Sequence, residues 1–291
     1  METSLAIISD TIWFTPALFV LAAMLALILE LVHRKERVPA GAPSSRPPGE
    51  SLRLNLDNLN EKLIIRFLIT VGVAVIAGMI ARTVASGRNL EMVYGIMFTG
   101  SGIALALTLW TWRVFARWRH SHLGFEGERM VGRELNLLML DGCRVFHDLV
   151  DPRIGNVDHI IVAAHAVFVV ETCTWSNHAP GVPGADPRVV FNGRELQFPD
   201  GKTDKPIKQV LRNAKWLEKY VMHKTGLQLP VFPILTLPGW TVERKGAGPV
   251  TVVNPKDIPS VVVDRVAAPI YDAQRQRIIN LLDEKCQYRP F

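Results

Sequence analysis

Two apolar runs with a very short gap between them decide the fold of the C-terminal part of this chain. Residues 157–163 read VDHIIVA and residues 167–175 read VFVVETCTW. Both runs are rich in β-branched and aromatic residues, which is typical of strands, and the short gap predicts a hairpin. If Ala164 and His165 form the turn, residues whose numbers sum to 329 face each other, and Asp158 lies opposite Glu171.

The predicted hairpin also brings a third polar side chain to the same face of the sheet. Cys173 lies two residues beyond Glu171, and side chains alternate between faces along a strand. The remaining residues of both runs are mostly apolar, so the carboxylates lie in a setting where they need a partner or a cation. Hard oxygen ligands suit Mg²⁺ or Mn²⁺. The alternative without a metal is a strand-end hydrogen bond for Asp158 and an arginine partner for Glu171.

The segments around the hairpin predict a mixed α/β domain over residues 121–291. The pattern predicts helices at 125–140, 205–224 and 269–282, and further strands at 143–150, 231–237 and 250–254. A second small hairpin is expected at 189–198, because Asn192-Gly193 is a strong turn dipeptide. A domain of this length is ordinary.

Three stretches within residues 1–120 predict membrane-spanning helices. They cover 11–32, 63–85 and 92–112, and a bilayer core needs roughly 20 apolar residues. The chain has a mean hydropathy of +0.18, and its charges are almost absent from these stretches. This segregation excludes a fully soluble protein, a disordered chain and a collagen-like one.

The basic residues predict an orientation in the membrane. They cluster at 33–37 and 113–120, directly after the first and third segments, whereas residues 1–10 have none. The positive-inside rule then places the N-terminus outside and the C-terminal domain in the cytoplasm, at the inner or plasma membrane. A cleaved signal peptide would need a basic start, so the first segment is interpreted as a retained anchor.

The remaining membrane-side segments have simple interpretations. Residues 38–50 form a Pro/Gly/Ser linker, and residues 52–62 predict an amphipathic helix at the inner membrane surface. Several glycines favour close helix contacts in lipid and, through them, a homo-oligomer. These glycines are Gly72, Gly78, Gly95, Gly100 and Gly102.

Cysteine and charge counts exclude two further classes. The three cysteines form no CxxC pair, which argues against a zinc ribbon and a disulfide framework. Residues 121–291 carry 21 Lys or Arg and 19 Asp or Glu, so the basic pI of about 9.4 reflects membrane flanks more than a nucleic-acid footprint. His147 and His159 are interpreted as hydrogen-bonded structural groups.

Several motifs of the C-terminal part resemble the NERD (nuclease-related) domain family. They are GFEGERMVG at 124–132, VFHDL at 145–149, GNVDHI at 155–160 and VFVVETCT at 167–174. QVLRNA at 209–214 and PVFP at 230–233 resemble later motifs of that family, so the resemblance covers about 124–255. It implies a restriction-endonuclease-like core of the PD-(D/E)XK type.

The resemblance also implies roles for individual residues. Asp158 and Glu171 match the metal-binding acids, for Mg²⁺ or Mn²⁺, and Glu128 matches a helix glutamate that binds the metal or its water. Gln209 matches a helical glutamine that positions the water or a phosphate. Cys173 stands where such nucleases have a lysine, and a thiol has no permanent charge and is a soft ligand. The candidates to replace that charge are Lys202, Lys205 and Lys208.

Three interpretations of function follow. The leading one is a membrane-anchored cytoplasmic protein that hydrolyses nucleic-acid phosphodiesters with Mg²⁺ or Mn²⁺. The second is a catalytically inactive binding or sensor module that kept the fold, and Cys173 is its main support. The third is a structural membrane protein whose helices oligomerise.

Overall fold

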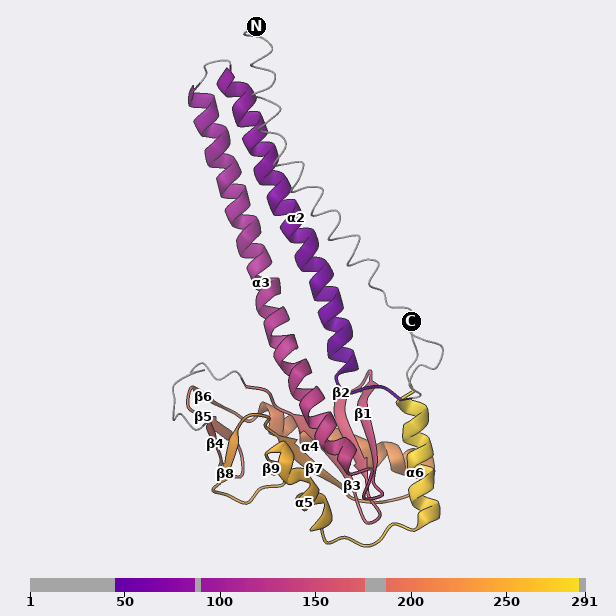
Figure 1. Ribbon diagram of the computed structural model, residues 1–291. Helices are drawn as coiled ribbons and strands as arrows, with labels where there is room; N and C mark the ends of the chain where they lie inside the picture. Colours follow the sequence, from indigo (N-terminus) through magenta and orange to yellow (C-terminus); the bar gives the residue numbers. More distant parts are fainter. Residues whose placement is uncertain (1–44, 87–89, 176–186, 288–291) are drawn as a thin grey trace. The chain divides into compact units, whose positions relative to one another are not determined.

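Long helices and β-sheets are the elements of this chain (Figure 1), which divides into two units. The computed structural model describes residues 45–86, 90–175 and 187–287. Leu56–Arg119 belong to the first unit, whereas Ala42–Asn55 and His120–Phe291 belong to the second. The predicted helix at 11–32 lies outside the described residues.

Two long helices, α2 (Glu50–Ser86) and α3 (Leu90–Leu137), contain the apolar segments. Both are long and apolar enough to cross a membrane, judged by length and composition, and they are the two such helices within the described residues. The prediction of separate helices at 52–62 and 125–140 was wrong. Neither α2 nor α3 contains a proline that would break the ladder of backbone hydrogen bonds, so each helix continues past the apolar segment.

Contacts between α2 and α3 in the first unit involve one of the five glycines named above. A Cβ on Gly100 would lie 2.7 Å from the Cβ of Ala77, so the backbones come close there. The other four have no heavy atom of the described neighbouring helix near them. Arg66 donates to the carbonyl of Trp110 at 3.0 Å, and its guanidinium lies 3.4 Å from the Trp110 ring centroid.

A five-stranded mixed sheet organises the second unit and confirms the predicted mixed α/β class. Its order is β1-β2-β3-β7-β9. The strands are β1 (Arg144–Asp151), β2 (Gly155–Val162), β3 (Val167–Thr172), β7 (Val231–Thr236) and β9 (Thr251–Val253). The first three pair antiparallel, whereas β3, β7 and β9 run parallel.

The β2–β3 hairpin has the predicted register. His159 pairs with Val170 and Val162 with Val167, and the Ala163 N–H donates to the Ala166 carbonyl at 2.9 Å. The turn therefore lies at Ala164 and His165. The same register, extended by one residue, brings Asp158 opposite Glu171.

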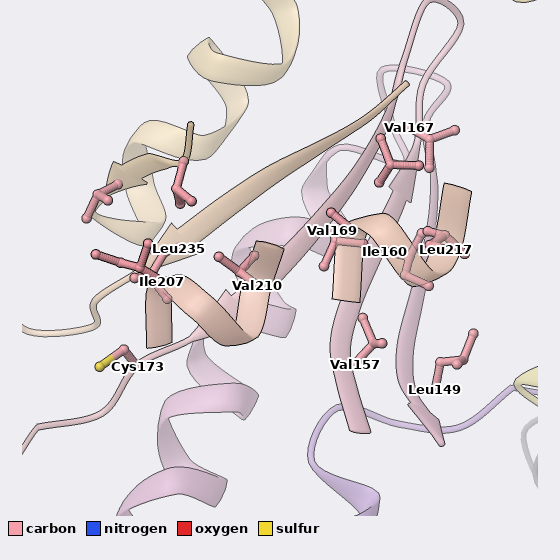
Figure 2. Packing of buried hydrophobic residues seen from close by; sticks show 14 of the residues in the cluster. Leu149, Val157, Ile160, Val167, Val169, Cys173, Ile207, Val210, Leu217 and Leu235 are labelled. Atoms are coloured by element: carbon pink, nitrogen blue, oxygen red, sulfur yellow. The ribbon is translucent and has the colours of Figure 1, made fainter. Parts of the chain in front are cut away.

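Helices cover both faces of the sheet. On one face, α4 (Lys205–Thr225) and α6 (Asp272–Lys285) pack on the strands. Figure 2 shows Ile207 and Val210 of α4 with Val169 of β3 in this cluster. The other face packs against the C-terminal part of α3 and against α5 (Ile258–Val263). The sheet is thus buried on both sides, as its apolar strands predict.

A smaller sheet of order β6-β5-β4-β8 completes the unit. Its strands are β4 (Arg188–Phe191), β5 (Leu196–Phe198), β6 (Gly201–Thr203) and β8 (Thr241–Arg244). The predicted hairpin around Asn192-Gly193 is confirmed, and Gly193 has a φ of 94°. A short 3-10 helix, η1 (Pro255–Asp257), precedes α5.

Candidate active site

Three buried carboxylates come from three elements of the second unit. Glu128 lies on α3 beyond its apolar segment, Asp158 on β2 and Glu171 on β3. Their exposed fractions are 6%, 6% and 2%. All three residues predicted as metal ligands are therefore in the interior, where an unpaired charge is costly.

Two amides on α4 hold the carboxylate of Glu171. Gln209 Nε2 donates to Glu171 Oε2 at 2.9 Å, and Asn213 Nδ2 donates to Glu171 Oε1 at 2.6 Å. The two amides are four residues apart, so they lie on the same face of the helix. Asn213 is fully buried and also donates to the Asn156 carbonyl at 3.1 Å. No role for Asn213 was predicted from the sequence, although its i,i+4 spacing from Gln209 is the signal that identifies it.

Asp158 is held by its neighbours on the hairpin. Its Oδ2 accepts from the backbone N–H of Thr172 at 2.8 Å, and its Oδ1 accepts from Asn156 Nδ2 at 3.3 Å. The predicted strand-end hydrogen bond is thus present. An arginine partner for Glu171 is not what the structure describes, because its carboxylate accepts from the two α4 amides.

Burial and mutual repulsion make these carboxylates hard to ionise. Burial, together with the smaller effect of the charges of Asp158, Asp148 and Glu171, raises the pKa of Glu128 to about 10. Burial and, to a smaller extent, the charge of Asp148 raise the pKa of Asp158 to about 7, although the hydrogen bond from the Thr172 N–H lowers it. The pKa of Glu171 is raised by burial and then by Asp158, although its two amide donors lower it.

The cluster is rich in oxygen atoms and poor in donors. Within the described residues, Glu128 Oε2, Asn156 Oδ1 and Asn213 Oδ1 are buried and accept no hydrogen bond. Hard oxygen donors of this kind fit a cation such as Mg²⁺ or Mn²⁺, which would compensate the buried charge. As they stand, however, no three Asp, Glu, His or Cys side chains in the described part of the chain are gathered closely enough to hold a metal ion.

Cys173 follows β3 directly and is 8% exposed. Burial raises the pKa of its thiol to about 12, with a further contribution from Asp158. Figure 2 shows it at the border of the apolar cluster, in which it packs with side chains of α4. The thiol is therefore neutral at physiological pH and supplies no positive charge to the cluster.

The three lysines considered as substitutes have other positions. Lys208 Nζ lies 2.5 Å from Asp204 Oδ2, and its side chain is 73% exposed. Lys202 and Lys205 are exposed as well. The structure does not bring any of the three to Glu171, whose described side-chain donors are the amides of Gln209 and Asn213.

A fourth carboxylate, Asp148 on β1, is fully buried next to the cluster. The pairing of His147 with His159 and of Leu149 with Val157 brings Asp148 opposite Asp158. Asp148 has a φ of 51°, a left-handed conformation that is uncommon for a residue other than glycine.

Arg46 of the predicted linker and Ser51 in the first turn of α2 hold this carboxylate. Arg46 Nε donates to Asp148 Oδ2 at 2.7 Å, and Ser51 donates through its backbone N–H at 3.0 Å and its hydroxyl at 2.5 Å. These donors from Arg46 and Ser51 contact both oxygens of the Asp148 carboxylate. Sequence reasoning missed this contact, because nothing in the sequence pairs residues about 100 positions apart.

Two buried histidines adjoin the carboxylates in sequence: His147 precedes Asp148, and His159 follows Asp158. His147 Nδ1 lies 2.9 Å from His159 Nδ1, and His147 Nε2 lies 3.0 Å from Asn136 Oδ1. Burial lowers the pKa of His147 to about 4 and lowers that of His159 well below its usual value. Because Asn136 Oδ1 only accepts, His147 carries its proton on Nε2 and accepts at Nδ1 from His159. The structural interpretation of both histidines is confirmed.

The comparisons with known proteins agree with the motifs quoted above. Residues 123–238 match the family model of NERD, the nuclease-related domain. The searches of curated proteins and of solved structures gave no match. The matched segment includes Glu128, Asp158, Glu171, Cys173 and Gln209, so the similarity to the nuclease-related domain covers all the residues of the candidate site.

Proposed function

We propose that this chain is a membrane-anchored nuclease-related protein whose second unit hydrolyses phosphodiester bonds of nucleic acid. The observation that carries the proposal is the buried, donor-poor cluster of Glu128, Asp158 and Glu171. Their mutual repulsion and their unpartnered oxygen are a cost to the fold that a divalent cation would remove. The family match over residues 123–238 supports the reaction class.

The residues of the chain have distinct tasks in this proposal. Asp158 and Glu171, with Glu128, would hold Mg²⁺ or Mn²⁺, which would supply an activated water and screen the phosphate charge. Gln209 and Asn213 fix the orientation of the Glu171 carboxylate before any ligand arrives. The backbone N–H of Thr172 does the same for Asp158. Such preorganisation limits the reordering that binding would otherwise require.

Mn²⁺ titration and cleavage by the full chain test the proposal together. Wild type should bind Mn²⁺ in isothermal titration and cut labelled oligonucleotides slowly, because Cys173 supplies no positive charge, and Asp158→Asn should lose both. Asp257→Asn removes an exposed carboxylate outside the cluster and should change neither. Equal Mn²⁺ binding by wild type and Asp158→Asn would refute the site.

The proposed location is the cytoplasmic side of the inner or plasma membrane. The length and apolar composition of α2 and α3 support the anchor. The basic residues at 33–37 and 113–120 support the orientation, because such clusters stay on the cytoplasmic side.

A second candidate function is a catalytically inactive module that binds nucleic acid or senses a ligand. Cys173 favours it, because its neutral, buried thiol stands where a lysine would stabilise transition-state charge. This candidate predicts oligonucleotide binding without cleavage at any Mg²⁺ or Mn²⁺ concentration. Cleavage that Asp158→Asn abolishes would exclude it.

A further inference from the structure

A pocket of about 270 Å³ in the second unit is lined by α3 and by the segment that follows β3. Six of its lining residues matter here: Gly127, Arg129, Arg133, Thr174, Trp175 and Gly239. Gly127 directly precedes Glu128 on α3, and Thr174 directly follows Cys173. The pocket is therefore close along the chain to two residues of the candidate site, Glu128 and Cys173.

Trp175 gives the pocket a rigid aromatic wall. Its ring stacks on Phe198 with centroids 4.4 Å apart and planes at 6°. Trp175 Nε1 donates to Asp200 Oδ1 at 2.8 Å, which fixes the orientation of the ring in its plane. Phe198 stacks on one face of the indole, and Trp175 is half-buried and lines the pocket, so part of the ring remains accessible to a ligand.

Two arginines on α3 give the pocket positive charge. Arg129 and Arg133 are one helical turn apart and so lie on the same face. Arg129 Nη1 pairs with Glu126 Oε1 at 3.2 Å, which partly offsets its charge. Arg133 is exposed and has no ion pair within the described residues. A guanidinium in this position suits a phosphate group.

We propose that this pocket binds one unpaired nucleotide of the substrate strand, with its base on Trp175 and its phosphate on Arg133. The inference rests on the proposed function for its substrate class and adds a preference for single strands. In a duplex both faces of each base are stacked on neighbours, so an aromatic wall is useful only for a base that is unpaired or at an end. Residues 121–291 carry nearly equal numbers of positive and negative charges. General electrostatic attraction to phosphates is therefore weak, and the affinity depends on local contacts of this kind.

Binding is measured by fluorescence anisotropy with the full chain in detergent and labelled single-stranded DNA, single-stranded RNA and duplex DNA. EDTA is present, so cleavage does not affect the result. Trp175→Leu should weaken single-strand binding by roughly 5- to 150-fold, the range for loss of one stacked base, and Trp175→Phe should keep most of the affinity. Comparison of the DNA and RNA arms shows which strand is preferred.

Arg133→Ala should weaken binding to all single strands alike and reduce the salt slope by about one. The matched control Arg277→Ala removes an exposed arginine from α6, away from the pocket lining, and should leave affinity and salt slope unchanged. Trp216→Leu is the control for Trp175→Leu, because Trp216 stacks on Tyr220 within α4.

The outcomes separate this inference from the proposed function. Unchanged single-strand affinity in both Trp175→Leu and Arg133→Ala would overturn the pocket, even in a protein that cuts nucleic acid. Duplex DNA bound as tightly as single strands would overturn it too. Single-strand binding that depends on Trp175 and Arg133, without cleavage in Mg²⁺ or Mn²⁺, would support the pocket and reject only the hydrolysis. Because Arg133 is exposed, its substitution keeps the test valid even if Trp175→Leu misfolds.

Discussion

Cys173 is the residue of the candidate site at which a positive charge is missing. It is neutral at physiological pH, since burial raises its pKa to about 12. Cys173→Lys should place an ammonium beside the carboxylates, where the charge of Asp158 and Glu171 favours it. One well-placed donor is worth roughly 2.7–4 kcal/mol, so single-turnover cleavage should rise about a hundredfold or more.

Two controls separate charge from packing at this position. Cys173→Met introduces a side chain about as long as lysine but without its charge, and it should not raise the cleavage rate. In a Glu171→Ala background Cys173→Lys should give no gain either, because the cation that the lysine would assist is no longer held. Robust cleavage by the unmodified chain, abolished by Asp158→Asn, would show that another group supplies the charge.

Asp151 at the end of β1 provides a clean pH test. Arg153 donates to it at 2.9 Å and Lys285 of α6 at 3.2 Å, and the hydrogen bonds from Arg153 are the main reason that its pKa lies well below 3.8. A carboxyl group whose pKa is lowered in the folded state stabilises the fold at pH values above its unfolded pKa. This stabilisation is lost as the pH falls through the folded pKa. Asp151→Asn should therefore lower the free energy of unfolding by about 1–1.5 kcal/mol at pH 7, at the low end for charged hydrogen bonds because Arg153 is exposed to water.

The same substitution should cost progressively less below pH 3.8. Denaturant unfolding of both proteins at pH 7 and pH 3 measures this narrowing. Asp283→Asn is the control, because Asp283 pairs with Arg144 at the surface, and such pairs contribute only about 0–1 kcal/mol. A pH-independent difference for Asp151→Asn would contradict the assignment.

At this scale, the sequence could predict part of the site. Asp158 and Glu171 follow from strand alternation and the hairpin turn, because both are local. Asn213 needs the packing of α4 on the sheet, and the pairing of Arg46 with Asp148 needs a long-range contact. Neither is visible in local spacing.

Among the elements, α3 comes close to the C-terminal end of β3 at Gly127. A Cβ there would collide with Thr174 Cγ2 and lie 3.4 Å from Thr172 Cγ2. Both threonines are β-branched and have little freedom to move aside. Gly127→Ala should therefore lower the free energy of unfolding by about 1–3 kcal/mol despite the better helix propensity of alanine. It should also weaken Mn²⁺ binding, because Glu128 and the end of β3 are displaced.

Gly124→Ala, one turn earlier in α3, is the matched control. Its nearest neighbour would be Leu52 Cδ1 at 3.2 Å, the end of a flexible side chain. The gain in helix propensity, roughly 0.8–1 kcal/mol, should then dominate. Denaturant unfolding of both variants checks the contrast, and equal effects would mean that Gly127 is no closer to β3 than Gly124.

The helices and strands could be predicted from the sequence where apolar residues recur at a regular spacing over a long stretch. The hairpin register and α4 follow from alternation and helical spacing. The strands β6 and β8, GKT and TVER, are short and mostly polar, so only pairing with neighbours makes them strands. The full lengths of α2 and α3 were missed, because a change from apolar to charged residues does not by itself end a helix.

In the whole molecule, Ala42–Asn55 belong to the second unit and not to the first unit, which contains the apolar segments of α2 and α3. The contacts of Arg46 and Ser51 with Asp148 explain this assignment. Arg46 also donates its backbone N–H to the Cys286 carbonyl at 3.0 Å. The sequence predicts a flexible linker at residues 38–50. The second half of this segment is instead part of the unit that carries the carboxylates.

The topology of the chain is the last prediction. Basic residues at 33–37 and 113–120 should remain in the cytoplasm, because translocating several arginines is costly and the inside carries the excess positive charge. A reporter fused after Phe291 should then be active only in the cytoplasm, and the same reporter inserted at residues 87–89 should report the opposite side. A reporter on the outer side after Phe291 would contradict the orientation. It would also exclude access of the carboxylates to cytoplasmic nucleic acid, so the fusion pair tests the setting in which the proposed hydrolysis takes place.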